Sequence, residues 1–165
     1  MKETLHEMLN ESILVELNVG KLYRLFYELY PEHAAFWWKI HLEEVNHAAL
    51  VRSIKEHFEP AGKIPTGLIS SSIEKLQASN IVIVTLIKQY SDTAPSVEEA
   101  FNMALNLELT VGEFHYQRFM DQDQNSVLDK TFQKLNKDDK NHAARLCSHM
   151  RHHDIAINDD IKDCC

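Results

Sequence analysis

Two short segments of this sequence each occur twice, and both carry residues that could bind metal ions. The segment E-L-x-V-G supplies a lone glutamate in each copy, and the segment [E/D]-[E/D]-x-N-H-A-A supplies a carboxylate three residues before a histidine. Carboxylate and imidazole groups suit Fe²⁺ or Mn²⁺, so this combination indicates a site for divalent metal ions. The candidate metal ligands are Glu16, Glu44, His47, Glu108, Asp139 and His142.

The order of the copies indicates a duplicated pair of helices. Glu108 follows Glu16 by 92 residues and His142 follows His47 by 95 residues, so the copies differ only by a small insertion. A duplicated hairpin would relate its halves by a pseudo-two-fold axis, and each copied residue would then face its counterpart. Residues three apart share one face of a helix, which places each carboxylate beside its histidine.

Charge explains why metal ions are expected at the centre of such a bundle. Burying an isolated carboxylate is costly, and four carboxylates in one place repel one another. Two divalent cations would neutralise them. Glu43 and Asp138 lie four residues before the histidines and are interpreted as outer residues that support the ligands. In the alternative, the six candidates pair with one another or with water and bind no metal.

Helices are the elements that must position these residues. Pro31 suits a first helical position, and Ser96 with Glu99 forms a capping box. Short links within each pair of helices predict two antiparallel hairpins. Apolar residues recur at intervals of three and four, which predicts long helices at residues 4–30, 31–57, 96–120 and 126–153.

A long crossover joins the two hairpins and contains an extra helix. Ser71 and Glu74 form the capping box that is expected to open it. Residues 81–87 are apolar on every side, which predicts a helix buried on both sides and a homodimer formed through this segment. The predicted fold class is all-α, a four-helix bundle of two pseudo-repeated hairpins. Residues 1–157 are its single domain, and residues 158–165 are a polar C-terminal tail.

Composition restricts the classes of function. The chain of 165 residues has a net charge of −8, which argues against a nucleic-acid partner. No apolar run reaches the about 18 residues of a membrane span, and the polar N-terminus is unlike a signal peptide. A cytoplasmic location without membrane contact is therefore expected. The cysteines fit no disulfide framework, and Cys164 and Cys165 are expected in a frayed tail.

Two other histidine-based sites are less consistent with the sequence. The H-E-x-x-H motif of zinc proteases is absent. The H-x-x-x-H spacing of His149 and His153 lacks the rest of a hemerythrin-like set. These two residues and His152 are interpreted as a polar helix end, where positive charge is favourable.

The repeated motif resembles that of the ferritin-like di-iron carboxylate proteins, most closely the rubrerythrin-like branch, over nearly the whole chain. The resemblance implies a ferritin-like bundle and two iron ions as cofactors, with manganese or a mixed pair as the alternative. It also implies redox chemistry with peroxide or dioxygen, either peroxide reduction or ferroxidase-like iron oxidation. Tyr23 stands where these proteins often keep a tyrosine near the metals, and it is the candidate catalytic residue.

The chain departs from the rubrerythrin pattern in three ways. Asp139 replaces the usual glutamate, the rubredoxin domain is missing, and Val111 and Gly112 stand where a further ligating glutamate is usual. An external electron donor would therefore be needed. The alternatives are metal binding without turnover, such as iron sensing or carriage, and a purely structural bundle.

Two glycines occupy matched positions, one turn beyond each lone glutamate. They are Gly20 and Gly112. Glycine inside a helix costs about 1 kcal/mol relative to alanine, so a matched pair suggests a reason for both. The sequence leaves two interpretations open, which are close packing of helices and space beside the metals for a small ligand.

Overall fold

The computed structural model describes residues 2–62, 72–112, 130 and 142–165, which form helices without any strand among them. The all-α class predicted from the sequence is confirmed. We call the helix of residues 142–152 the C-terminal helix. The other elements are α1 (Lys2–Leu29), η1 (Pro31–His33), α2 (Ala34–Phe58), α3 (Ile73–Asp92), α4 (Val97–Leu107), η2 (Glu108–Gly112) and η3 (Lys162–Cys164).

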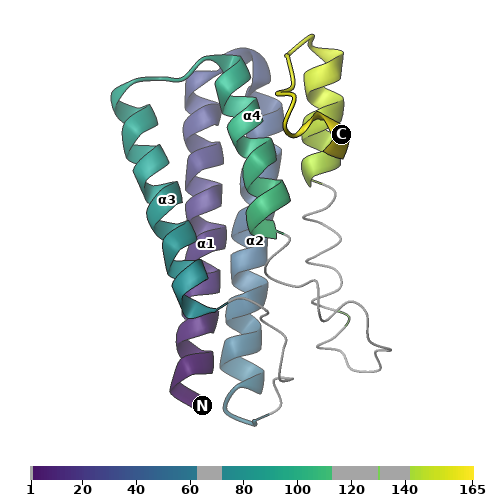
Figure 1. Cartoon of the computed structure of the whole chain (residues 1–165). Helices are drawn as coiled ribbons and strands as arrows, with labels where there is room; N and C mark the ends of the chain where they lie inside the picture. The colour runs from purple at the N-terminus through teal and green to yellow at the C-terminus, as the bar shows by residue number, and fades with distance from the viewer. Residues whose placement is uncertain (1, 63–71, 113–129, 131–141) are drawn as a thin grey trace.

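Helices α1 and α2 form an antiparallel hairpin (Figure 1). The turn between them begins where the Tyr30 N–H donates to the Phe26 carbonyl over 3.0 Å, and Pro31 then opens the 3-10 turn η1. Proline is tolerated there because its missing N–H has no helical partner to bind. Helix α1 also packs against α3, which runs in the same direction, and α4 returns antiparallel to them (Figure 1).

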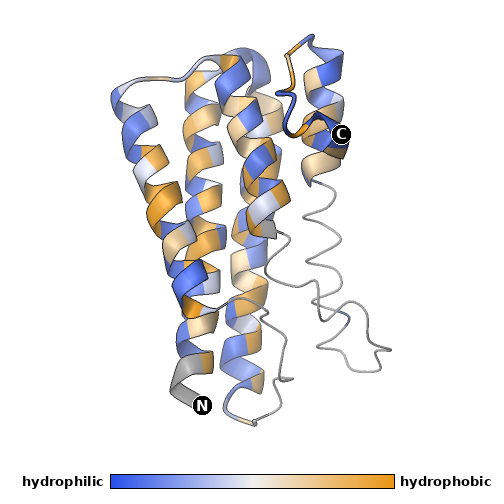
Figure 2. Cartoon of the chain, in the orientation of Figure 1, coloured by the Kyte–Doolittle hydropathy of each residue, from blue (hydrophilic) through white to orange (hydrophobic). Residues whose placement is uncertain are grey.

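Aromatic side chains fill the core where the hairpin meets α4. Trp37 is fully buried, and its ring lies 4.9 Å from that of Phe26 and 4.4 Å from that of Phe101. Figure 2 shows apolar and polar residues alternating around the helices, as expected when one face of each helix is buried. Among the described helices, none has both the length and the apolar character needed to cross a bilayer.

Helix α3 confirms the extra helix expected in the crossover but begins one residue late. Its N-cap is Ser72, whose hydroxyl accepts a hydrogen bond from the Lys75 N–H. The predicted capping box with Glu74 is therefore wrong by one residue, and Ser71 lies outside the described residues. The capping box of α4 is confirmed, because Ser96 and Glu99 exchange both of its hydrogen bonds.

Only one face of α3 is buried in the chain. Its buried Asn80 binds the Asn18 side chain over 2.9 Å and fastens α3 to α1. Ile81, Val82 and Val84 point outward and are 67%, 53% and 51% exposed. The prediction that this helix is buried on both sides is wrong for the single chain, since α3 lies at the edge of the molecule (Figure 1). A homodimer formed through this face stays a prediction.

The helix predicted for residues 96–120 changes its hydrogen-bonding pattern at a candidate ligand. Helix α4 ends at Leu107, and the π-helical turn η2 begins with Glu108. Single π-helical turns within α-helices are frequent at functional sites. Residues 113–120, like most of the predicted helix from 126 to 141, lie outside the described part of the chain.

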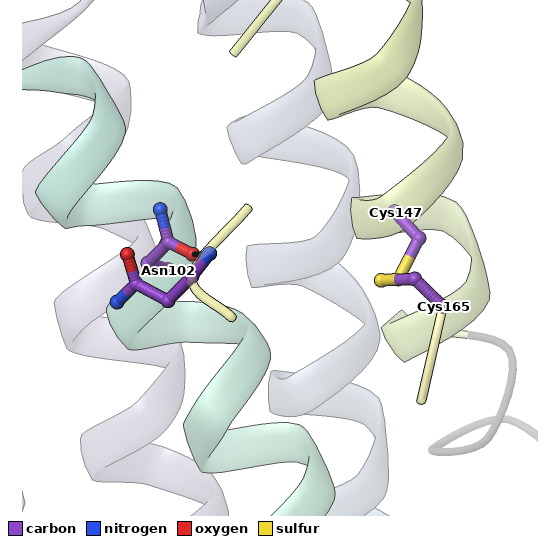
Figure 3. The surroundings of a disulfide bond; sticks show 4 residues. Asn102, Cys147 and Cys165 are labelled. Carbon is purple, nitrogen blue, oxygen red and sulfur yellow. Dashed lines mark hydrogen bonds between the residues drawn. A yellow bond between two sulfur atoms is a disulfide. The ribbon is translucent and has the colours of Figure 1, made fainter. Parts of the chain in front are cut away.

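The last residues fold back onto the molecule, so the predicted frayed tail is wrong. Asn102 of α4 donates to the Ala156 carbonyl over 2.8 Å and accepts a bond of the same length from the Asn158 N–H. A disulfide joins Cys147 of the C-terminal helix to Cys165 (Figure 3). The spacing of the cysteines did not reveal the pair, because it does not show where the chain turns back.

We expect the substitution Cys165→Ser to lower the free energy of unfolding by about 3 kcal/mol under oxidising conditions. The disulfide spans 18 residues, and a loop of this size restricts the unfolded chain by that amount. Urea denaturation without reductant measures the effect. The matched control is Cys164→Ser, because Cys164 is free and exposed. Equal stability of the two variants would contradict the assignment.

Candidate metal centre

Four helical segments bring five of the six candidate ligands into one buried cluster. They come from α1, α2, the turn η2 and the C-terminal helix, and none is exposed by more than 8%. The sixth candidate, Asp139, lies outside the described residues. The clustered residues are Glu16, Glu44, His47, Glu108 and His142.

One half of the cluster surrounds His47. Its Nδ1 lies 3.3 Å from Glu44 Oε2 and 3.5 Å from Glu16 Oε2. One ligand atom from each of these three residues lies within 4.8 Å of the other two. The three side chains therefore converge closely enough to hold one ion, provided that they shift by a small amount toward it.

The other half surrounds His142 and shares a carboxylate with the first. His142 Nδ1 lies 2.8 Å from Glu44 Oε1 and 3.6 Å from Glu108 Oε1. Glu44 therefore turns one oxygen toward each histidine. The two imidazole rings lie 5.4 Å apart and are nearly parallel. The two groups of three residues therefore share one carboxylate, that of Glu44.

An outer ion pair fixes the orientation of His142. Its Nε2 donates to Glu43 Oε2 over 2.8 Å, and Glu43 also pairs with the Arg145 guanidinium. A histidine whose Nε2–H is held by a carboxylate presents Nδ1 to the opposite side, as metal-binding histidines commonly do. The sequence indicated that Glu43 is an outer residue supporting the candidate ligands, and in the structure it contacts His142 but is not one of the residues of the cluster.

Arg145 was missed in the sequence analysis. The repeat contained a signal, because Arg145 stands where the first copy of the segment has Leu50. A charged residue that replaces an apolar one in a near-duplicate indicates a partner found in one half only. That partner is Glu43. Burial raises the pKa of Glu43, but the hydrogen bond from His142 and then the hydrogen bonds and charge of Arg145 outweigh burial and lower this pKa to about 2.

Tyr23, the candidate catalytic residue, touches the centre directly. Its hydroxyl donates a hydrogen bond to the Glu108 carboxylate, and the side chain is fully buried. The ring of Trp37 lies 5.7 Å away on the side of the core. Tyr23 is thus held between a candidate ligand and an aromatic side chain that can be oxidised.

Protons balance the charge of the cluster when no metal is present. Burial lowers the pKa of His47, but hydrogen bonds and charges from Glu16 and Glu44 outweigh it and raise that pKa to about 11. The pKa of His142 is raised in the same way, chiefly by Glu44 and Glu108. Burial raises the pKa of Glu16 to about 7, while the two histidines outweigh burial and lower the pKa of Glu44.

Two atoms of the cluster make no hydrogen bond within the described residues, and a divalent ion could bind to both. Glu44 Oε1 and His142 Nδ1 are buried and lie 2.8 Å apart as an ion pair, yet they are not aligned as a hydrogen bond and neither atom makes one within the described residues. Buried polar atoms are nearly always satisfied, and an exception calls for an explanation such as an ion. The residues present therefore fit a metal centre.

Gly20 is explained by close packing. A Cβ atom at this position would lie 3.3 Å from the Cβ of Glu44, tighter than ordinary contact, and the Gly20 carbonyl accepts a hydrogen bond from His41 Nδ1 over 2.8 Å. Because Gly20 has no side chain, α1 can lie close to α2 at the Cβ atom of Glu44. The structure favours the packing interpretation for Gly20.

We expect the metal-free protein to lose stability as pH rises above about 7. The pKa of His47 is raised from 6.5 to about 11 on folding, so its stabilising effect is full below 6.5 and is lost as pH rises toward the folded value. The pKa of Glu16 is raised from 4.5 to about 7, so this group also makes stability fall as pH rises, between about pH 4.5 and pH 7. Each proton retained by the folded state changes the free energy of unfolding by up to about 1.4 kcal/mol per pH unit.

Urea denaturation of chelator-treated protein between about pH 7 and pH 9 measures this slope, since the folded state there keeps protons that the unfolded chain has lost. The variant His47→Gln removes one of the titrating groups and should flatten the profile. A profile that is flat in the metal-free protein itself would show that the histidines do not carry these protons.

Comparison with known proteins gives no match for this chain. The sequence fits no protein-family model, and the chain matches no curated protein and no solved structure. The resemblance to the ferritin-like proteins therefore rests on the repeated motif alone.

Proposed function

We propose that the protein binds two divalent metal ions in this centre, with iron as the first choice, and uses them in redox chemistry with peroxide or dioxygen. The observation that supports this most strongly is the position of Glu44 between His47 and His142. Each histidine has a further carboxylate beside it, Glu16 in one half and Glu108 in the other. Asp139 is the remaining candidate ligand of the proposal.

Iron is the first choice because the repeated motif resembles that of the ferritin-like di-iron proteins. The donors in the described cluster, which are oxygen and imidazole nitrogen without a thiolate, agree with this choice. Such mixed sets suit Fe²⁺ and Mn²⁺, and they leave coordination positions open. Bound iron would supply the electrons that reduce the oxidant. The ferritin-like bundle implied by the sequence motif is part of the same proposal, since di-metal carboxylate sites of this kind are built from facing helices.

The residues around the centre have separate tasks in this proposal. The Tyr23 hydroxyl holds a proton at the edge of the ligand set, where it can be donated to a reacting oxygen. The ion pair of Glu43 and Arg145 keeps His142 oriented. Reduction of peroxide to water takes up two electrons and two protons, so repeated turnover needs an external electron donor.

The alternative is a structural bundle that binds no metal. The observation in its favour is that protonated His47 and His142 supply positive charge to the cluster carboxylates, while Arg145 pairs with Glu43 beside the cluster. Against it stands the poor alignment of the ion pair of Glu44 Oε1 and His142 Nδ1, which leaves both buried atoms without a hydrogen bond within the described residues. Metal binding without turnover is the third candidate, and the variants below distinguish all three.

We expect protein purified anaerobically from iron-supplemented cells to hold about two iron ions per chain, the content of a paired carboxylate site. Glu44→Gln should lose both ions because its carboxylate is shared, whereas Glu16→Gln and Glu108→Gln should each lose mainly one. Elemental analysis measures the content, and Glu98→Gln is the control because Glu98 is exposed. Wild-type protein without metal would support the structural bundle instead.

The substitution Tyr23→Phe should separate binding from turnover. It removes the hydroxyl that contacts Glu108 and keeps the ring packed. We expect an unchanged iron content and a peroxide-dependent oxidation of the iron slowed by about 100-fold, a usual effect of losing a general acid. Stopped-flow absorbance measures the rate. Iron that binds normally but does not react with peroxide or dioxygen in the wild type would leave metal binding without turnover.

A further inference from the structure

Three histidines gather at the end of the molecule where α1 turns into α2. His33 comes from η1, His149 lies in the C-terminal helix, and His153 directly follows the last residue of that helix. His33 Nδ1 lies 3.0 Å from His149 Nε2, and one ring nitrogen from each of the three lies within 4.8 Å of the other two. His33 is buried, His149 is half-buried and His153 is exposed.

The spacing of these nitrogens is close to that of ligands on one ion. Two nitrogens bound tetrahedrally to Zn²⁺ at about 2.0–2.1 Å lie roughly 3.3 Å apart, so His33 and His149 need to separate by only a few tenths of an ångström. The His153 N–H still bonds to the His149 carbonyl over 3.1 Å, so His153 continues the helical path by one residue. The spacing of four residues then places the two imidazoles on one face. The exposed His153 can turn toward them.

The surroundings hold two of the rings in place and disfavour their charged form. His149 stacks on Phe36 with ring centroids 4.2 Å apart and on Phe101 at 5.1 Å. Burial and the neighbouring histidines lower the pKa of His149 to about 4. Burial, followed by His153, also lowers the pKa of His33 against an opposing effect of Glu32. Neutral imidazole is the form that binds metal.

We propose that His33, His149 and His153 form a second metal site, for an ion of the zinc class. The described group contains three imidazoles and no carboxylate, a donor set that favours Zn²⁺, Cu²⁺ or Ni²⁺ over Mg²⁺, Ca²⁺ or Mn²⁺. Because His153 is exposed, the fourth position of a tetrahedral ion is open to water.

The site is separate from the carboxylate centre and has a different consequence. His149 follows His142 by seven residues on the same helix, so the two sites lie about 10 Å apart along its axis. An ion bound by His33 and His149 joins the turn between α1 and α2 to the C-terminal helix. Zinc binding is therefore expected to stabilise the contact between that helix and the hairpin.

The experiment uses the full chain and Zn²⁺ as the probe, in competition with a chromophoric chelator. Removing a partner outside the ligand set already weakens metal binding by about 10–100-fold, so His153→Asn and His33→Asn should each weaken one zinc site by at least about 100-fold. His152→Asn is the matched control, because His152 is exposed, adjacent and outside the group. The exposure of His153 makes its variant safe for folding.

The outcomes distinguish a built site from a chance pair of surface histidines. The proposal expects zinc to raise the melting temperature of wild type and of His152→Asn by more than that of His33→Asn and His153→Asn, since only binding to the folded site stabilises. Co²⁺ should show the visible absorption of a tetrahedral ion in the first two proteins only. Zinc binding that is unchanged in His33→Asn would overturn the proposal, because a pair on one helix would then suffice.

Discussion

The rest of the structure depends on the placement of one buried carboxylate between two buried imidazoles. Glu44 is 3% exposed, and its two oxygens face His47 and His142. A buried carboxylate without compensation would be far more costly than a typical net stability allows. Positive charge has to reach it, as protons on the histidines or as metal ions. Metal ions bound here would displace those protons, since metal binding to such ligands releases protons.

The helices around this cluster differ in how they support it. Helix α1 comes close because Gly20 has no side chain facing Glu44. The turn η2 interrupts the regular α-helix where Glu108 enters the site. The C-terminal helix carries His142, and the tail that follows it is fastened to α4 and back to the helix itself by Asn102 and the disulfide. The helix that carries His142 is thus anchored beyond this residue, by the disulfide at Cys147 and by the tail that follows the helix.

Much of the secondary structure and part of the site could be predicted from the sequence. Helical periodicity, Pro31 and the capping box of Ser96 depend on residues a few positions apart. The helices α1 and α2 and the capped start of α4 are confirmed, whereas Pro31 opens the 3-10 turn η1 and α4 ends at Leu107. The repeated segments identified Glu44 and His47 as residues of a core stripe, and both are buried. These features are local, so the order of residues along the chain is enough to reveal them.

Contacts between distant parts of the chain were decided only by the tertiary structure. The sequence determined which polar side chains lie on the apolar stripes, but not that Glu43 would hold His142 or that His33 would meet His149. It also did not reveal the pairing of Cys165 or the exposed edge of α3. Such contacts depend on how whole helices pack, and packing responds to shape and buried charge across the molecule. The sequence by itself therefore determined the elements and the chemistry of their faces, and the packing of the helices decided which faces meet.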